Sequence, residues 1–333
     1  MEADGKHLLI IRLSALGDVA MTVPVIYSLA RKYPDLTITV LTRKFFSRLF
    51  INAPDNIRFV MADTTGIHAG IKGLLRLTRE LKRLDVDMVA DLHDSLRSRI
   101  IGVAFKSSGK PVETVDKDRK NRSQLTKRGN RPPVQQKPYI DRYVDVFQRL
   151  GFDISPDFKS LVNTTKQPGT IGIAPFARYS TKTYPPELME QVAAHFAQKG
   201  MTVYLFGSKG EEAAILQSWE DKYAGCKAMP GKLGIEDEIK LMASLPVMIT
   251  MDSANMHLAS LAGTTVISIW GSTTPHCGFM GYGQSAGNAV TLGLPCQPCS
   301  IAGKPECPEG HFECMRRIAP QTIIAKAEAA LNL

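Results

Sequence analysis

The stretch from Met251 to Pro275 restricts the fold of this chain more than any other. The apolar run Leu245 to Thr250 leads into it and has the length of a short buried strand. Residues 255–262 then follow a helical period, and the run Thr265 to Trp270 predicts a second strand. Parallel strands need a crossover connection, and a helix between two strands supplies one. The chain should therefore fold around a parallel α/β sheet.

The start of that helix is a predicted anion site. Asp252 and Ser253 are N-cap residues by type, and Gly263 ends the helix. Ligands of open parallel sheets bind beyond the carboxyl ends of the strands, where such a helix begins. The N–H groups of Ser253, Ala254 and Asn255, together with the helix dipole, suit a diphosphate. We interpret this feature as a cradle for a nucleotide-sugar.

Length and composition fit a two-domain globular protein. The chain has 333 residues, which suits two domains of about 150 residues each. Its 44% hydrophobic and 22% charged residues are ordinary for a soluble protein. The net charge of +9 favours anionic ligands or an anionic membrane surface. We expect a cytoplasmic protein, because no apolar run approaches about 18 residues and the N-terminus lacks a basic region and a cleavage site.

Strands and helices alternate through the first half of the chain. The predicted strands are Lys6 to Leu13, Thr37 to Thr42, Ile57 to Met61 and Asp87 to Leu92. The predicted helices are Val19 to Tyr33 and Gly70 to Leu84. Pro24 should lie in the first turns of its helix, where a proline is least costly. This alternation predicts a doubly wound first domain.

The same alternation starts again after a predicted linker, Asn163 to Gly169. We therefore expect domains at residues 1–165 and 166–333. The second set comprises strands at Thr170 to Ala174 and Thr202 to Phe206, and helices at Pro186 to Gln198, Glu211 to Trp219 and Ile235 to Ala243. A site between two such domains would be lined by strand ends from both.

Lys106 to Lys137 is rich in Lys and Arg and has almost no apolar residues. It should be an exposed, mobile, cationic loop, followed by a helix from Pro138 to Leu150. The segment from Lys117 to Lys137 has no aromatic residue for base stacking, so no nucleic-acid partner is expected.

Several local patterns together resemble glycosyltransferase family nine, the heptosyltransferases that use ADP-heptose in lipopolysaccharide core assembly. They are IIRLSALGDVAMTVPVIYSLARKYP, APFARYSTKTYPPE, LFGSKGEE, MDSANMHLASLAGTTVISIWGSTTP and the cysteine-containing tail from Leu294 to Pro320. The resemblance implies a GT-B fold, in which two Rossmann-like domains face each other across a cleft. It also implies an N-terminal acceptor side, a C-terminal nucleotide-sugar side, and transfer with inversion and without a metal.

Asp18 matches the aspartate of the family pattern S-x-x-G-D-V, which implies a catalytic role. Inverting transfer needs a carboxylate that takes the proton of the acceptor hydroxyl. The same position also fits a structural N-cap of the helix from Val19, which would make the carboxylate a weaker base.

The resemblance also implies donor-binding residues. Lys182 matches a lysine that contacts the donor phosphates, with Thr181 in the same loop; the alternative is a solvated lysine. Glu211 matches a glutamate that binds ribose hydroxyls, although a first-turn carboxylate that only favours the helix dipole would explain the position equally. Glu212 could take the role of Glu211.

The family pattern D-[ST]-G-x-x-H corresponds to Asp252, Ser253, Ala254 and His257. Ala254 stands where glycine is usual and Asn255 where proline is frequent in one branch. Alanine keeps its N–H, so the cradle survives, but its methyl group narrows the approach of the diphosphate. His257 would either donate to phosphate or hold the preceding loop.

The tail cysteines have the spacing C-x2-C-x7-C-x6-C at Cys296, Cys299, Cys307 and Cys314. They predict either a structural Zn²⁺ site, with His311 as a spare ligand, or a disulfide pair. No catalytic metal or other cofactor is expected.

The sequence thus predicts a GT-B enzyme that transfers heptose or a related sugar from a nucleoside diphosphate to a lipid-linked glycan. In this hypothesis Arg119, Lys120 and Arg122 face the phosphorylated acceptor or the inner face of the inner membrane. Three alternatives remain. They are a nucleotide-sugar epimerase of the same fold, a zinc- and nucleic-acid-binding protein, and a Rossmann dehydrogenase, which the lack of G-x-G-x-x-G after the strands disfavours.

Overall fold

The computed structural model describes residues 5–127 and 134–333. This part of the chain divides into two compact units, one formed by the described residues up to Lys117 with Tyr139–Lys159, the other by those of Asp118–Pro138 with Ser160–Leu333. The boundary predicted at residue 165 lies after this division, and the roles predicted for the two halves stay predictions.

The first unit is built on a parallel sheet with strand order β3-β2-β1-β4-β5. The strands are β1 (His7–Ile11), β2 (Thr37–Thr42), β3 (Ile57–Met61), β4 (Met88–Asp91) and β5 (Val112–Thr114). Its helices are α1 (Leu16–Lys32), α2 (Lys44–Ser47), α3 (Gly70–Lys82), α4 (Leu96–Lys106) and α6 (Tyr139–Arg149). β1 is central, so the residues that follow it lie in the middle of the carboxyl edge of the sheet.

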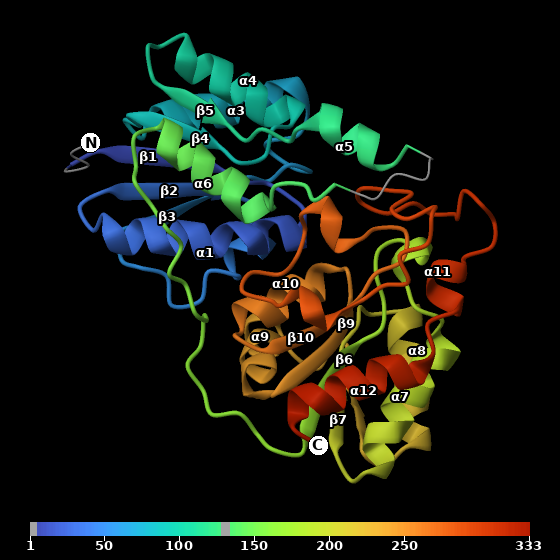
Figure 1. Cartoon of the computed structure of the whole chain (residues 1–333). Coiled ribbons are helices and arrows are strands. Elements are labelled where there is room, and N and C mark those ends of the chain that lie inside the picture. Colours follow the sequence, from blue (N-terminus) through green and yellow to red (C-terminus); the bar gives the residue numbers. More distant parts are fainter. Residues whose placement is uncertain (1–4, 128–133) are drawn as a thin grey trace. The chain divides into compact units, whose positions relative to one another are not determined.

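Helices cover both faces of this sheet, which is why its central strands are buried along most of their length. Figure 1 shows α3 and α4 on one face and α1 on the other. Leu9 and Ile11 of β1 pack in one apolar cluster with Leu77 of α3 and with Ile101 and Phe105 of α4. On the opposite face α1 packs against α6. The predicted doubly wound arrangement is confirmed.

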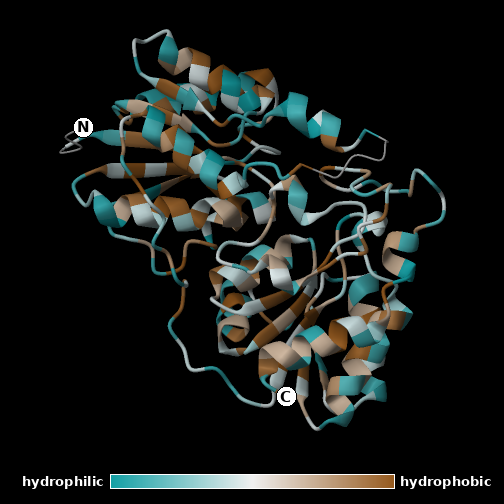
Figure 2. Cartoon of the chain, viewed as in Figure 1, coloured by the Kyte–Doolittle hydropathy of each residue, from teal (hydrophilic) through white to brown (hydrophobic). Residues whose placement is uncertain are grey.

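The second unit has a parallel sheet with strand order β11-β10-β9-β6-β7-β8. The strands are β6 (Thr170–Ala174), β7 (Thr202–Leu205), β8 (Cys226–Ala228), β9 (Val247–Met251), β10 (Thr265–Ile269) and β11 (Ala289–Val290). Its helices are α5 (Arg119–Leu125), α7 (Pro186–Gln198), α8 (Glu211–Lys222), α9 (Ile235–Ser244), α10 (Ala254–Leu261), α11 (Glu313–Arg316) and α12 (Pro320–Leu331). Figure 2 shows that the strands of both sheets are largely hydrophobic, as expected of sheets buried on both faces. The predicted strand, helix, strand unit is β9, α10 and β10.

Two predictions about helices need correction. α1 begins at Leu16 rather than Val19, so Pro24 is buried in the middle of the helix and does not lie in its first turns. The predicted cationic loop, Lys106 to Lys137, contains the strand β5 and a helix, α5, between Arg119 and Leu125; its residues 128–133 lie outside the described part. A search of the described residues also found no helix with the length and hydropathy needed to span a membrane.

Candidate functional site

In the first unit, an ion pair marks the carboxyl end of β1. The Arg12 guanidinium lies 2.7 Å from Oδ1 of Asp18, and Oδ2 of Asp18 accepts a hydrogen bond of 3.1 Å from the N–H of Ala15. Asp18 occupies the third position of α1, so it is not the N-cap residue that the alternative interpretation required. Its side chain is 30% exposed, which leaves it accessible.

Arg12 fixes the position of that carboxylate. Its side chain is only 5% exposed, and Nη1 donates a hydrogen bond of 2.6 Å to the carbonyl of Leu92, at the end of the neighbouring strand β4. The guanidinium also lies 6.0 Å from the ring centroid of Tyr143 in α6. Sequence analysis did not assign Arg12 a role, although a lone arginine in an apolar strand is a signal that it could have used.

His93 lies beside this pair. Its Nε2 is 3.3 Å from Oγ of Ser14, and its Nδ1 is 3.3 Å from Oγ of Ser95. Burial, followed by the positive charges of Arg12 and Lys117, lowers the pKa of His93 to about 4. The imidazole is therefore neutral at pH 7 and offers one donor and one acceptor to a ligand or to these hydroxyls. The sequence showed only that a buried strand ends near His93.

In the second unit, Lys182 pairs with Asp252. Nζ of Lys182 lies 2.8 Å from Oδ2 of Asp252, and their side chains are 13% and 5% exposed. Oδ2 also accepts a hydrogen bond of 2.5 Å from Thr273, in the loop after β10. Lys182 is thus a mostly buried lysine whose ammonium is held at the carboxyl ends of β9 and β10, and not a solvated loop lysine.

The loop that carries Lys182 is tied to a later segment, which we name the tail loop (residues 294–305). Oγ1 of Thr181 donates a hydrogen bond of 2.6 Å to the carbonyl of Lys304 and accepts one of 3.1 Å from its N–H. The N–H of Ser272 donates to the carbonyl of Thr181, and the N–H of Ser300 donates to that of Ser272, each over 3.0 Å. Thr181 is therefore buried and connects its loop to the tail loop. This structural role explains the residue without a direct contact to a donor.

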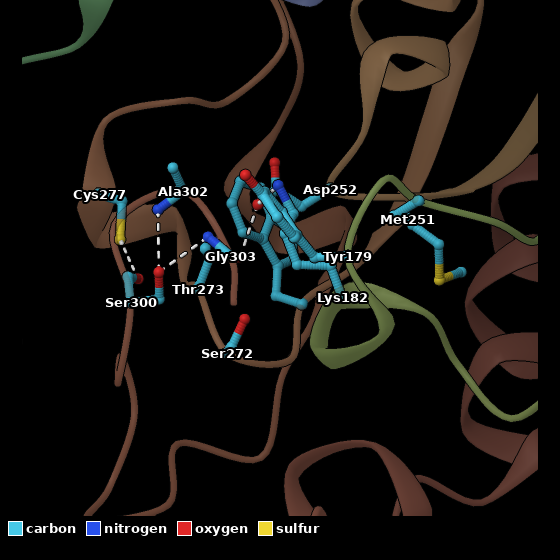
Figure 3. Close-up of polar contacts among 12 residues, drawn as sticks. Tyr179, Lys182, Met251, Asp252, Ser272, Thr273, Cys277, Ser300, Ala302 and Gly303 are labelled. Carbon is cyan, nitrogen blue, oxygen red and sulfur yellow. Dashed lines mark hydrogen bonds and ion pairs between the residues drawn. The ribbon is translucent and has the colours of Figure 1, made fainter. Parts of the chain in front are cut away.

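Within the tail loop, Oγ of Ser300 accepts hydrogen bonds from the N–H groups of Ala302 (3.2 Å) and Gly303 (2.8 Å), as Figure 3 shows. These bonds fold the loop so that Gly303, with a φ of +104°, lies against Tyr179 and Lys182. A Cβ at this position would lie 2.5 Å from Cδ2 of Tyr179 and 2.8 Å from Cδ of Lys182. Sequence analysis missed this contact because nothing local to Gly303 indicates it.

The N-terminus of α10 follows Asp252 directly. Ser253, Ala254 and Asn255 are partly exposed, and the first N–H groups of a helix have no partner within it. Ser253 is the N-cap residue, but its side chain does not cap the helix, and among the described residues its buried Oγ has no hydrogen-bond partner. Asp252, predicted as an N-cap residue as well, instead binds Lys182 and Thr273. His257 is buried one turn into the helix.

The two glutamates at the start of α8 differ. The carboxylate of Glu212 accepts a hydrogen bond of 2.6 Å from the N–H of Ser208 and so closes the loop before the helix. Glu211 is exposed in the first turn of α8. A ribose contact by Glu211 stays a prediction.

The six cysteines form no disulfide. Burial raises the pKa of Cys314 to about 12, and burial also raises the pKa values of Cys296 and Cys299, so these thiols are protonated at pH 7. A search of the described residues found no group of three or more His, Cys, Asp or Glu side chains arranged to hold a metal ion. The tail cysteines are thus free thiols in this structure, and the two predicted alternatives, a structural Zn²⁺ site or a disulfide pair, stay predictions.

The predicted acceptor-side residues lie on α5. Arg119 and Lys120 are exposed, whereas the guanidinium of Arg122 lies 5.7 Å from the ring centroid of Phe279. The structure thus brings together Thr181, Lys182, Asp252 and the start of α10. Asp18 belongs to the first unit, with partners that sequence analysis did not name.

Two parallel-sheet units in one chain, one of them with a lysine beside a helix N-terminus, fit the predicted GT-B fold. The model of glycosyltransferase family 9 (heptosyltransferase) matches residues 74–309, and the chain belongs to that family. The predicted resemblance is confirmed.

The chain is also similar to individual members of this group over nearly its whole length. Lipooligosaccharide heptosyltransferase 2 of Campylobacter jejuni subsp. jejuni serotype O:2 is 23% identical over 325 residues, which cover 95% of this chain and 96% of that protein. A solved family 9 glycosyl transferase from Veillonella parvula aligns with a TM-score of 0.78 at 20% identity, covering 100% and 99% of the two chains. The structure of ADP-heptose lps heptosyltransferase II from E. coli aligns with a TM-score of 0.70 at 16% identity, covering 98% of each. The predicted GT-B fold class is confirmed.

Proposed function

We propose that this glycosyltransferase transfers a heptose from ADP-heptose to a lipopolysaccharide core acceptor, with inversion at the anomeric carbon and without a metal ion. The names of its relatives, a lipooligosaccharide heptosyltransferase and an ADP-heptose heptosyltransferase, support the donor and the acceptor class. The alternative of a zinc- and nucleic-acid-binding protein lacks support from any contact described above.

The observation that carries the proposal is the position of Lys182. Its ammonium is paired with Asp252, one residue before the N-cap Ser253 of α10. A diphosphate at this helix N-terminus would meet the amides of Ala254 and Asn255, the positive end of the helix dipole and the Lys182 ammonium. Ser253 would add a hydroxyl whose oxygen has no other partner among the described residues.

Asp18 is proposed as the general base. Its carboxylate takes the proton of the acceptor hydroxyl while that oxygen forms a bond to the anomeric carbon of the donor. The bond from the anomeric carbon to the diphosphate oxygen breaks in the same step, and the electron pair leaves with ADP. Lys182 and the α10 amides stabilise the charge that develops on the diphosphate, so this scheme needs no metal ion.

The acceptor is proposed to be lipid-linked, so the enzyme would work as a peripheral protein at the inner face of the inner membrane. Arg119, Lys120 and Arg122 of α5 supply positive charge for the phosphates of such an acceptor. Glu211 and His257 are proposed to contact the nucleotide part and the phosphates of the donor, respectively.

The test is donor binding followed by transfer. Thermal shifts with ADP-heptose, UDP-glucose, GDP-mannose and CMP-sialic acid should show the largest rise in melting temperature with ADP-heptose. ADP release should then need a heptose-deficient lipopolysaccharide acceptor. Release of ADP without an acceptor would instead support the epimerase, and preference for another nucleotide-sugar would overturn the proposed donor.

A further inference from the structure

The exposed apolar side chains of this protein are concentrated on one pair of helices. Of the eleven large hydrophobic side chains that are exposed in the described residues, six lie between Ile67 and Val103. The two most exposed are Ile71 of α3 and Leu96 of α4, each at 78%. In Figure 2, hydrophobic and hydrophilic segments alternate along these two helices.

On α4 the exposed apolar residues form a continuous stripe. Leu96, Ile100 and Val103 are spaced by four and three residues, which places them on one side of the helix. Ile101 and Phe105, on the other side, are buried in the core. The apolar stripe of α4 thus faces away from the sheet.

α3 lies beside α4 on the same face of the sheet, and Nζ of Lys82 donates a hydrogen bond of 2.8 Å to Oγ of Ser108, just after α4. Its exposed apolar residues are Ile71 and Leu75, one turn apart. We name the surface formed by the exposed residues of α3 and α4 the α3/α4 face.

Positive charge surrounds these apolar residues. The two helices carry seven basic residues, Lys72, Arg76, Arg79, Lys82, Arg97, Arg99 and Lys106, against one acidic residue, Glu80. Glu80 is itself paired, 2.9 Å from Arg76 and 3.0 Å from His68, and Arg99 is paired with Asp94, just before α4, over 2.6 Å. The net charge of the two helices is thus +6 (7 − 1), within a chain whose net charge is +9.

We propose that the α3/α4 face docks the protein on an anionic phospholipid bilayer. Aliphatic side chains that enter the interface, together with Lys and Arg that bind anionic headgroups, are the two features by which peripheral helices hold a membrane. A second copy of this chain is a poorer occupant because two faces of the same high positive charge repel each other. Nucleic acid is also a poorer fit, since the exposed side chains between the basic residues are aliphatic and not aromatic.

This inference rests on the proposed function in one respect, since a lipid-linked acceptor would be reached from the bilayer surface. The surface differs from the one that the sequence predicted, which was the basic segment containing α5.

The experiment measures co-flotation of the full chain with vesicles of phosphatidylcholine alone, or of phosphatidylcholine with phosphatidylglycerol. We expect binding to the anionic vesicles only, weakened by salt. The double variant Leu96→Glu/Val103→Glu should lose at least about tenfold in vesicle affinity, because each charge would enter the interface beside anionic lipid. Its melting temperature should not change, since both side chains are exposed.

The matched control is Val134→Glu/Leu292→Glu, which makes the same change at two exposed apolar residues of the second unit. It should bind vesicles as the unmodified protein does. The proposal is overturned if the unmodified protein does not bind anionic vesicles, if both double variants bind equally well, or if Leu96→Glu/Val103→Glu splits a dimer in gel filtration.

Two assays separate this inference from the proposed function. If the α3/α4 face docks the enzyme, Leu96→Glu/Val103→Glu should keep transfer to a detergent-solubilised acceptor and lose transfer to the same acceptor in vesicles. Absence of transfer to either acceptor by the unmodified protein, with vesicle binding intact, would reject the proposed function alone.

Discussion

The carboxylate of Asp18 is held by two groups at once: its Oδ1 lies 2.7 Å from the guanidinium of Arg12, and its Oδ2 accepts a hydrogen bond from the N–H of Ala15. The family pattern identifies Asp18 but not Arg12. The arrangement therefore assigns different tasks to the two residues: Asp18 would move the proton, and Arg12 would orient the carboxylate that receives it.

Asp18→Asn should lower turnover by about two to four orders of magnitude, because the amide cannot accept the proton of the acceptor hydroxyl. Donor affinity should stay within about twofold, since the proposed donor contacts lie in the second unit. Stopped assays of ADP release and calorimetric titration with ADP check the two expectations. Asp35→Asn, at an exposed position, is the control. Undiminished turnover would remove Asp18 from the role of base.

Lys182→Met should weaken ADP binding by about tenfold to a hundredfold, the range expected for loss of a charge-assisted contact to phosphate. Binding of adenosine, which has no diphosphate, should not change. The variant also leaves the buried Asp252 carboxylate without its cation, so Lys182→Met/Asp252→Asn should be more stable than Lys182→Met while its ADP affinity stays low. Calorimetry and thermal melts measure both effects. Equal loss of ADP and adenosine affinity would show that Lys182 supports the fold only.

Gly303→Ala should displace Lys182, because the added Cβ meets both Tyr179 and Lys182 well inside contact distance. We expect ADP affinity to fall about tenfold, the same direction of change as that expected for Lys182→Met. Gly293→Ala is the matched control: it lies at a φ of +64°, in the left-handed region that strains alanine, but has no atom within 4 Å of the added Cβ. If the two variants bind ADP equally, backbone strain and not the contact with Lys182 explains any effect.

His93 should make stability depend on pH. Its pKa is lowered from 6.5 to about 4 in the folded state, so between these values the unfolded chain binds more protons than the folded one. Stability therefore increases as pH rises through this range, and it is lost as pH falls towards 4. His93→Gln should remove this contribution. The quantity to measure is the difference in free energy of unfolding between the two proteins. Glu238, whose pKa is raised to about 7 by burial, makes stability change with pH in the opposite direction in both of them.

The measurement for His93 is urea unfolding of both proteins at several pH values. A Gln side chain keeps a polar group near Ser14 and Ser95 without a titration in this range. Parallel stability curves for the two proteins would contradict the assigned pKa. A difference that grows as pH rises from 4 to 6.5 would confirm it.

The alternation of strands and helices was predictable because strands buried on both faces appear in the sequence as short apolar runs. The first residue of α1 was not predictable, since Ser14 to Gly17 has the composition of a turn. The helix begins at Leu16, where the Asp18 carboxylate accepts from the N–H of Ala15, a contact that hydrophobic period does not show. α5 was missed for a related reason: it contains no buried residue and so has no apolar face to detect.

Of the candidate site, only residues that belong to a single local motif could be predicted from the sequence. The motifs identified Lys182 and Asp252 separately, and their ion pair joins residues that are 70 positions apart (252 − 182). Arg12, His93 and Gly303 lie in or near motifs, but their importance comes from neighbours that only the tertiary structure brings close. The cysteines show the opposite case, because their spacing suggests zinc or a disulfide, while all six are free thiols in the fold.

The hydrogen bonds of Thr181 to Lys304 and of Ser272 to Ser300 can form only late in the synthesis of the chain. The ribosome makes the loop carrying Lys182 and the start of α10 well before it makes the tail loop that fixes them. The nascent second unit can build its sheet and pair Lys182 with Asp252 early, yet the contacts of Thr181 with Lys304 and of Lys182 with Gly303 form only after residue 304 has emerged. A polypeptide released before that point would contain the family motifs for the donor and lack these contacts.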